Sequence, residues 1–178
     1  MIVESKRLIL RKFKINDLET MLKYRNDPIV SKYDGWRGNI SRDEGIKFIE
    51  EVLNFDLQSI NNWNQIAFEF KATNIHIGDC GIRRFDEGRQ AEIGIRIDHD
   101  YWGQGLAFEG LSTLITYLFS NIGIQRIIAI CDTRNQNSIK LLTKLGMRKE
   151  GHSLSSYYKN KEWTDEFQFA ILKKELQK

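Results

Sequence analysis

A glycine-rich stretch from Asp98 to Ala107 has residue types and spacing suited to holding a phosphate group. Gly103 and Gly105 allow a tight turn and let a ligand approach bare backbone. An apolar stripe with three- and four-residue spacing begins at Leu106, so a helix should start directly after the glycines. The first turn of a helix leaves backbone N–H groups unpaired, and the helix dipole favours an anion beside them. The stretch therefore predicts an anion site at the start of a helix.

Two familiar phosphate-binding loops fit this stretch poorly. The dinucleotide-binding fingerprint needs a third glycine at the position of Phe108. The P-loop needs a lysine and a serine or threonine after its last glycine, whereas Gly105 is followed by Leu106 and Ala107. Taken alone, the pattern fits an ordinary glycine-rich connection equally well, so the surrounding elements must decide between the two interpretations.

The other candidate nucleophiles and metal ligands form no recognisable motif. His76, His99 and His152 are scattered along the chain without metal-ligand spacing, and the sequence has no Gly-x-Ser-x-Gly elbow. Cys80 and Cys131 lie far apart in apolar runs, which is typical of buried reduced thiols. We therefore expect neither a metal site nor a serine-hydrolase triad.

The composition indicates a globular domain without a strong charge bias. The 178 residues are 41% hydrophobic, and a chain of this length buries roughly 70% of its unfolded surface. Lys and Arg number 27 against 24 Asp and Glu, and a net charge of +3 is too small to indicate a nucleic-acid partner. The sequence shows no signal-peptide core and no run of about 18 apolar residues. We expect a single cytoplasmic domain over residues 1–178, a monomer or homodimer that contacts no membrane.

Local patterns predict the elements that precede the glycine-rich stretch. A helix capped at Asn16–Asp17 should end at Pro28, and the capping-box sequence Ser41–Glu44 should open a second helix. Alternation predicts antiparallel strands over residues 7–13, 66–70, 75–85 and 91–97. The last of these strands places on one buried face Ala91, Ile93, Ile95 and Ile97, and on the other face Glu92, Gly94 and Arg96.

After the glycine-rich stretch the predicted sheet changes from antiparallel to parallel pairing. The run from Gln125 to Cys131 is almost continuously apolar and follows a helix long enough for a crossover, which is typical of a parallel strand buried on both faces. A helix from Asn135 to Gly146 and two strands, 147–158 and 163–172, should complete the domain. A parallel pair within an antiparallel sheet leaves strand ends where a ligand can enter. The glycine-rich stretch lies at this break.

In combination, these motifs resemble the GNAT superfamily of acyl-CoA N-acetyltransferases, most closely its RimJ/RimL-like branch. The resemblance rests mainly on Ala91–Gly94, Tyr101–Ala107, Asn135-x-x-Ser138 and Leu145–Met147, and is extended by Leu8–Arg11, Asp79–Gly81, Glu150–Gly151 and Trp163–Asp165. It covers nearly the whole chain. It implies an α/β fold of the α+β type, in which helices flank a mixed, mostly antiparallel sheet with a central splayed parallel strand pair.

The resemblance implies acetyl-CoA as cosubstrate. The family cradles the CoA pyrophosphate mainly with backbone N–H groups, so Trp102, which replaces the usual Arg or Gln of the signature, need not abolish binding. Helix capping is the competing role for Asn135 and Ser138. The residues expected to bind the cofactor are Ile95, Arg96, Ile97, Trp102, Gly103, Gln104, Gly105, Leu106, Ala107, Asn135 and Ser138.

Acetyl transfer to an amine needs a neutral amine and stabilisation of the negative charge that develops on the thioester oxygen. Glu92 is the candidate to accept the ammonium proton, directly or through water, and a framework carboxylate is its alternative role. A backbone N–H near Gly94 or Ile95 should polarise the thioester carbonyl, provided that this strand is bulged as it is in the family.

The departing thiolate needs a proton from an acid. Many members of the family use a Tyr four residues before the helix-terminal glycine, and this position is Leu142 here. Ser138 is the nearest hydroxyl in the sequence and is therefore our candidate acid, while Tyr157 or Tyr158 could also approach.

The resemblance implies an enzyme whose acceptor is a primary amine, either a protein N-terminus or a small molecule such as a polyamine, an amino acid or an aminoglycoside. Tyr33 and Trp36 are the candidate substrate residues, with Tyr24 and Trp63 as further walls of the site. Core or lid packing is the competing role for these aromatic side chains. The alternative function is a non-catalytic acyl-CoA-sensing or partner-binding domain, which the absent tyrosine would permit.

Overall fold

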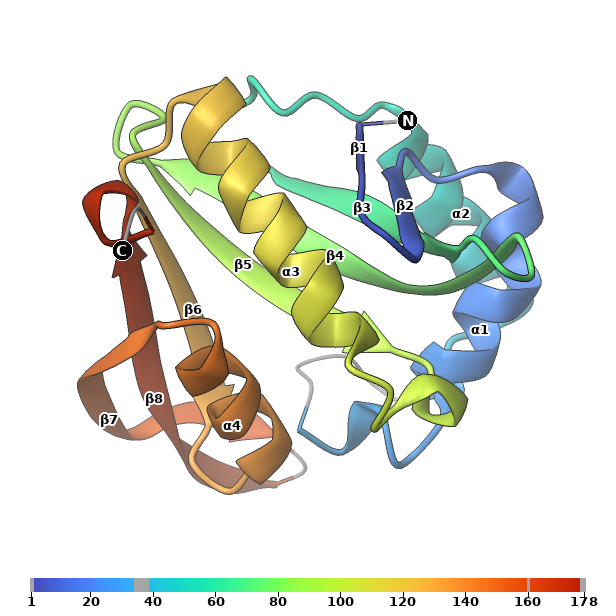
Figure 1. The fold of residues 1–178 in the computed structure, drawn as a ribbon. Helices are drawn as coiled ribbons and strands as arrows, with labels where there is room; N and C mark the ends of the chain where they lie inside the picture. Colours follow the sequence, from blue (N-terminus) through green and yellow to red (C-terminus); the bar gives the residue numbers. More distant parts are fainter. Residues whose placement is uncertain (1, 34–38, 160, 177–178) are drawn as a thin grey trace.

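Eight strands form one sheet in the computed structural model, which describes residues 2–33, 39–159 and 161–176 (Figure 1). The strands are β1 (Val3–Glu4), β2 (Leu8–Arg11), β3 (Trp63–Phe70), β4 (Ile75–Phe85), β5 (Gln90–Ile97), β6 (Arg126–Asp132), β7 (Arg148–Lys159) and β8 (Glu162–Leu172). Their order in space is β1-β2-β3-β4-β5-β6-β8-β7. Among these described strands, β5 and β6 are the one parallel pair of neighbours. The predicted mixed, mostly antiparallel sheet is confirmed.

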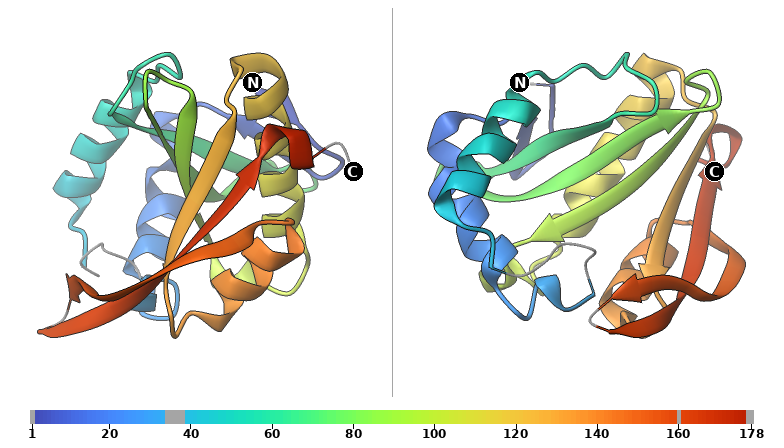
Figure 2. Two further views of the ribbon diagram at one scale, coloured as in Figure 1. Left: turned by 90° about the vertical axis from the view of Figure 1, so that its left-hand side faces the viewer. Right: turned by 180° about the vertical axis from the view of Figure 1, so that it is seen from behind.

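Helices cover both faces of the sheet. They are α1 (Leu18–Asn26), α2 (Arg42–Leu53), α3 (Leu106–Tyr117) and α4 (Gln136–Lys144). The helix α3 crosses one face, and α1 and α2 lie on the opposite face (Figures 1 and 2). Each face has its own apolar cluster, one including Leu111 and Leu114 of α3, the other Met21 of α1 and Ile49 of α2. None of the helices in the described ranges is long and apolar enough to cross a membrane.

Of the two predicted helix caps, the one at Ser41 is confirmed and the one at Asp17 is wrong. Ser41 Oγ accepts the Glu44 N–H, and the Glu44 carboxylate accepts the Ser41 N–H at 2.8 Å, so the capping box opens α2. Asp17 does occupy the N-cap position of α1, but its side chain makes no cap bond there. It accepts the Lys14 N–H at 2.8 Å and pairs with Arg11 at 2.7 Å. The Asp17 carboxylate therefore pairs with the buried Arg11 and does not cap the helix.

Most predicted boundaries agree with the structure within one or two residues. The strand expected over residues 7–13 is shorter, because it ends where the Arg11 side chain turns into its buried ion pairs with Asp17 and Glu69. The two-residue strand β1 was not predicted, since so short a segment carries no alternation. Cys80 and Cys131 are free and buried, as expected.

The parallel pair splays apart after three residues. Gln90, Ala91 and Glu92 of β5 pair with residues 126–128 of β6, and among the described residues β5 has no β6 partner beyond Glu92. The strand β6 instead stays paired with β8 as far as Asp132. On β5 the predicted faces are also observed, because Ala91, Ile93 and Ile97 are buried in the α3 cluster. The opening between the two strands is where the site lies.

Candidate active site

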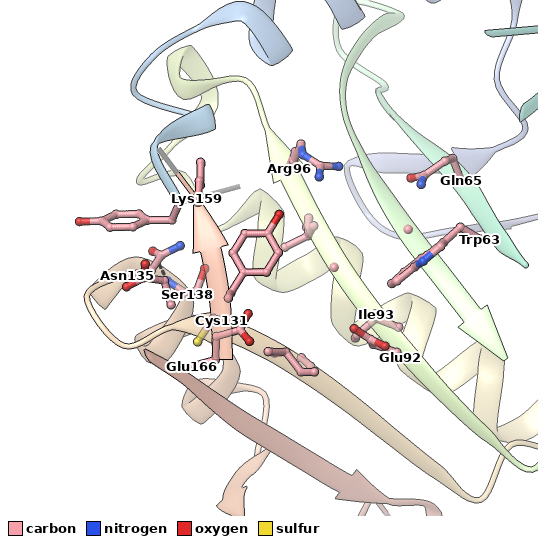
Figure 3. Close-up of a pocket in the computed structure, with 18 of the residues that line it drawn as sticks. Trp63, Gln65, Glu92, Ile93, Arg96, Cys131, Asn135, Ser138, Lys159 and Glu166 are labelled. Atoms are coloured by element: carbon pink, nitrogen blue, oxygen red, sulfur yellow. Dashed lines mark hydrogen bonds between the residues drawn. The ribbon is translucent and has the colours of Figure 1, made fainter. Parts of the chain in front are cut away.

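A cavity of about 1230 Å³ occupies the opening between β5 and β6 (Figure 3). Glu44, Phe48 and Glu51 of α2 line it from one face of the sheet. Ser138 and Leu142 of α4 line it from the α3 side. Because residues from helices on opposite faces share this lining, the cavity passes through the sheet. Two substrates could therefore approach its centre from opposite sides.

One wall of the cavity is the strand β5 itself. Ile93, Gly94, Ile95 and Arg96 all line the cavity. Beyond Glu92 the polar backbone edge that faces the opening pairs with no strand of the described ranges, and such an edge can add an extended ligand through main-chain hydrogen bonds. Of the three β5 residues expected to bind the cofactor, Ile95 and Arg96 line the cavity, whereas Ile97 is buried outside the lining.

The expected bulge in β5 is not present. The register with β4 runs without a shift from Gly78↔Ile97 to Phe85↔Gln90. The bulge, which was the condition for an oxyanion donor at Gly94 or Ile95, was therefore wrongly predicted.

Glu92 lies where the two strands separate (Figure 3). Its Oε2 lies 2.5 Å from Arg83 Nη2, and its side chain is 14% exposed. Within the described residues Oε1 has no hydrogen-bond donor. One oxygen is thus held by a cation, and the other remains available to a group inside the cavity. The carboxylate has both an anchor and a free acceptor.

The glycine-rich stretch forms an open turn between β5 and α3, named the anion cradle below for its candidate role. Gly103 and Gly105 both have φ +74°, a left-handed conformation that glycine adopts without strain. Gly105 is the N-cap residue of α3 and has no side chain to cap the first turn. A Cβ built on Gly103 would contact no described atom within 4 Å. Backbone N–H groups at this helix start are therefore exposed to an external anion.

Trp102 has a structural role in this loop. Its Nε1 donates to the Ile97 carbonyl oxygen at 2.7 Å, while the ring is 41% exposed. The bond ties the loop to the last residue of β5. Gln104 contributes a further side-chain bond to the Asp100 carbonyl oxygen at 3.3 Å. The departure from the signature at Trp102 thus replaces a polar side chain with one whose hydrogen bond holds the loop against β5.

Asn135 caps α4, which is one of the roles left open by the sequence, and both Asn135 and Ser138 lie at the cavity. Asn135 Oδ1 accepts the Ser138 N–H at 3.1 Å and caps α4. Both residues also line the cavity (Figure 3). Because the cap uses the backbone of Ser138, its hydroxyl stays free, and it has no hydrogen bond within the part of the chain described. Capping therefore does not compete with a function of this hydroxyl.

The aromatic candidates divide between the cavity and the core. Tyr33 and Trp63 line the cavity, as does Tyr157. Tyr24 was expected as a wall of the acceptor site, which is wrong: it is fully buried, and its hydroxyl donates to Asp79. Trp36 lies outside the described residues.

Cys131 also lines the cavity, next to Ser138 and Glu166 in Figure 3. Burial, together with the negative charges of Asp132 and Glu166, raises the pKa of its thiol to about 11. The thiolate is the nucleophilic form of cysteine, so this residue is a poor nucleophile near neutral pH. The arrangement favours direct transfer between two bound substrates over a covalent cysteine intermediate.

Several cavity residues were not predicted from the sequence, among them Glu51, Lys159 and Glu166. Lys159 donates to the carbonyl oxygens of Ser31 and Lys32, at 2.8 and 3.2 Å, so it holds the end of β7 against the turn before Tyr33. These residues come from separate elements with no shared motif. Their only signal in the sequence is charge within amphipathic segments, which surface residues share.

A buried charge cluster of Asp79, Arg25 and Arg96 lies beside the β5 wall of the cavity. Asp79 is fully buried, lies 2.8 Å from Arg25 Nη2 and lies 3.6 Å from Arg96 Nη1. Burial alone would raise the pKa of Asp79, but Arg25 and Arg96 outweigh it and hold the pKa below its ordinary value. The cluster therefore fixes an ionised carboxylate behind Arg96, whose side chain lines the cavity.

The fold and this cavity define the class of protein, and comparison with known sequences agrees. The pattern of the acetyltransferase (GNAT) domain family matches residues 7–148. The uncharacterized N-acetyltransferase p20 of Bacillus licheniformis is 34% identical over 175 residues, which cover 96% of each chain. The chain therefore belongs to the GNAT acetyltransferase family.

Solved structures share the whole fold. A GNAT-family acetyltransferase from Bacillus anthracis matches with a TM-score of 0.88 and 27% identity, covering 97% of this chain and 99% of that one. A spermidine N-acetyltransferase from Vibrio cholerae, solved in complex with CoA and spermine, matches with a TM-score of 0.81 and 20% identity over 97% and 99% of the two chains. At 20% identity, the likeness to the Vibrio cholerae enzyme concerns the fold alone.

Proposed function

We propose that this chain is a single-domain N-acetyltransferase that moves acetyl from acetyl-CoA directly to a primary amine. The carrying observation is the unpaired edge of β5, which leads from the cradle at Gly103 and Gly105 to Glu92. In this proposal the pyrophosphate lies on the cradle, the pantetheine arm follows the β5 edge, and the thioester lies between Glu92 and Ser138. The Vibrio cholerae structure with bound CoA supports acetyl-CoA as the donor for this fold. The motifs of the chain also favour the RimJ/RimL-like branch.

In this mechanism the amine attacks the thioester carbonyl and the C–S bond breaks. Glu92 accepts the proton of the incoming ammonium, and the Ser138 hydroxyl donates a proton to the departing CoA thiolate. The nitrogen of the tetrahedral intermediate gives its extra proton back to Ser138 as the intermediate collapses, and Glu92 releases its proton to solvent. Both side chains line one cavity, on opposite sides of its centre (Figure 3). No residue is acylated.

The decisive test is a screen of amines with acetyl-CoA that follows both thioester consumption and thiol release. The panel should contain monoamines, diamines, aminoglycosides and peptides with free N-termini. Turnover with at least one amine supports the proposal. CoA binding without turnover on any amine favours a non-catalytic acyl-CoA sensor instead.

Replacing Ser138 by alanine should lower kcat by about 10²-fold, because loss of a proton donor costs that much in comparable reactions. The KM for acetyl-CoA should change little, since the α4 cap uses the backbone N–H of Ser138 and survives the substitution. Steady-state kinetics across pH would measure both effects, with Tyr157→Phe as the matched hydroxyl control. An unchanged rate and an unchanged alkaline limb in Ser138→Ala would rule out the acid role.

The charges of the cavity favour a cationic acceptor. Among the described residues, its lining carries five carboxylates and two cations, namely Glu44, Glu51, Glu92, Asp132, Glu166, Arg96 and Lys159. Arg83 pairs with Glu92, and Arg134 pairs with Asp132 at 2.7 Å. Glu51 has no ion pair or hydrogen bond within the described ranges, and its carboxylate lies on the α2 side of the sheet. We infer that the acceptor is a small amine with a second positive charge, which Glu51 attracts.

Replacing Glu51 by glutamine should raise the KM for a diamine by about fivefold, as expected for one exposed ion pair. The KM for a monoamine of equal chain length should not change, and kcat should be preserved for both. Glu50→Gln is the matched control, because Glu50 is exposed on the same helix and lies outside the cavity lining. Equal KM values for the diamine in the wild type and Glu51→Gln would remove Glu51 from acceptor binding.

A further inference from the structure

Arg7 joins the N-terminal strands to the glycine-rich loop. Its Nη1 donates to the Gln104 carbonyl oxygen at 2.9 Å, and its Nε lies 2.6 Å from Glu109 Oε2. A Cβ built on Gly105 would lie 3.6 Å from Arg7 Nη2 and within 4 Å of no other described neighbour. The guanidinium group therefore lies beside Gly105, at the start of α3.

Glu109, in the first turn of α3, receives three hydrogen bonds from the N-terminal segment. Ser5 Oγ and the Arg7 N–H donate to its Oε1 at 2.7 and 2.6 Å, and Arg7 Nε donates to its Oε2. Burial would raise the pKa of Glu109, but these bonds together lower it. An ionised carboxylate so close to the helix start would repel an incoming phosphate. Arg7 supplies the charge that offsets this repulsion.

One corner of the Arg7 guanidinium remains uncommitted. Its Nε and Nη1 are used by Glu109 and Gln104, whereas Nη2 has no hydrogen bond to the described part of the chain. The side chain is 38% exposed, so Nη2 can reach a ligand. A planar fork can bind a carboxylate, a carbonyl and a phosphate at once, whereas the point charge of a lysine cannot hold this geometry.

We propose that Arg7 binds the pyrophosphate of the donor through Nη2 while Nη1 and Nε hold the glycine-rich loop in its open shape. The inference deepens the proposed function and rests on the use of an acyl-CoA donor. It assigns Arg7 to cofactor binding although it lies about a hundred residues before the loop in the sequence.

The test compares acetyl-CoA with acetyl-pantetheine, which has the same thioester but no pyrophosphate. Arg7→Met should raise the KM for acetyl-CoA and the Kd for CoA by about tenfold, the order expected for a lost charge-assisted hydrogen bond. With acetyl-pantetheine the variant and the wild type should have the same kcat/KM. Arg7→Lys, which keeps the charge and loses the fork, should show an intermediate loss with acetyl-CoA.

Lys6→Met is the matched control, because it removes the adjacent exposed cation, which has no hydrogen bond or ion pair within the described part of the chain. A loss of CoA affinity in Lys6→Met equal to that in Arg7→Met would show a long-range charge effect and overturn the inference. An equal loss of acetyl-pantetheine turnover in Arg7→Met would overturn it too, because it would show a role in folding alone. If Arg7→Met does not fold, Arg7→Lys gives the same comparison. A wild-type chain that binds no CoA by calorimetry would overturn the proposed donor as well.

Discussion

Replacing Glu92 by glutamine is expected to lower kcat by about 10²-fold or more, because a positioned general base contributes roughly 10²- to 10⁴-fold. The KM for acetyl-CoA should stay close to that of the wild type. Glutamine has nearly the shape of glutamate and can still accept the bond from Arg83 Nη2, but it cannot take a proton from an ammonium group. Steady-state kinetics at pH 7 would measure the loss. The difference in kcat between the wild type and Glu92→Gln should become smaller toward pH 10, because more of the acceptor amine is then already deprotonated when it binds.

Two controls separate this role from a framework role. Arg83→Met breaks the ion pair but keeps the carboxylate, so a base at Glu92 predicts that this variant retains most of kcat. A framework carboxylate predicts equal losses in Glu92→Gln and Arg83→Met. In Glu92→Ala, added formate should restore part of the rate if the missing group is a base. Near-normal turnover of Glu92→Gln would remove Glu92 from the mechanism.

The predictions that succeeded rest on local rules of the chain. Alternation along residues 91–97 gave the two faces of β5, and Gly103 and Gly105 do adopt the positive φ that their type permits. The continuous apolar run ending at Cys131 predicted the parallel strand, but its expected burial on both faces is wrong, because Ile130 is 41% exposed. Each of these features is decided by neighbours within a few residues, so it can be read from one segment at a time.

The predictions that failed depend on contacts between distant segments. Tyr24 lies on the apolar stripe of α1, and a buried tyrosine hydroxyl needs an acceptor, which only packing against β4 identifies as Asp79. The regular register of β5 depends on pairing with β4 and not on its own residues. Glu51 of α2 and Glu166 of β8 share one cavity only because the sheet brings their elements together. No spacing rule connects them.

The cluster around Asp79 links the stability of the fold to the geometry of the cavity. Tyr24 donates its hydroxyl to Asp79, Arg25 donates at 2.8 Å, and the guanidinium of Arg25 packs 4.2 Å from the centre of the Phe48 ring of α2. Asp79 thus ties α1 and α2 to β4 on one face of the sheet. Arg96, on the neighbouring strand, lies 3.6 Å from the same carboxylate and lines the cavity.

Replacing Asp79 by alanine is therefore expected to lower the free energy of unfolding at pH 7 by about 3–5 kcal/mol, because it leaves Arg25 buried without its counter-ion. Glu19→Ala, which breaks an exposed pair with Arg42, should cost far less and is the matched control. Denaturant unfolding monitored by tryptophan fluorescence would measure both variants, and equal losses would contradict the assignment.

The pH dependence of this stabilisation follows from the lowered pKa of Asp79. The contribution of the Asp79 carboxylate to the free energy of unfolding should be complete above pH about 4, the ordinary pKa of Asp. This contribution should be lost as the pH falls through the lower folded-state pKa. The difference in stability between the wild type and Asp79→Ala should therefore shrink only in acid.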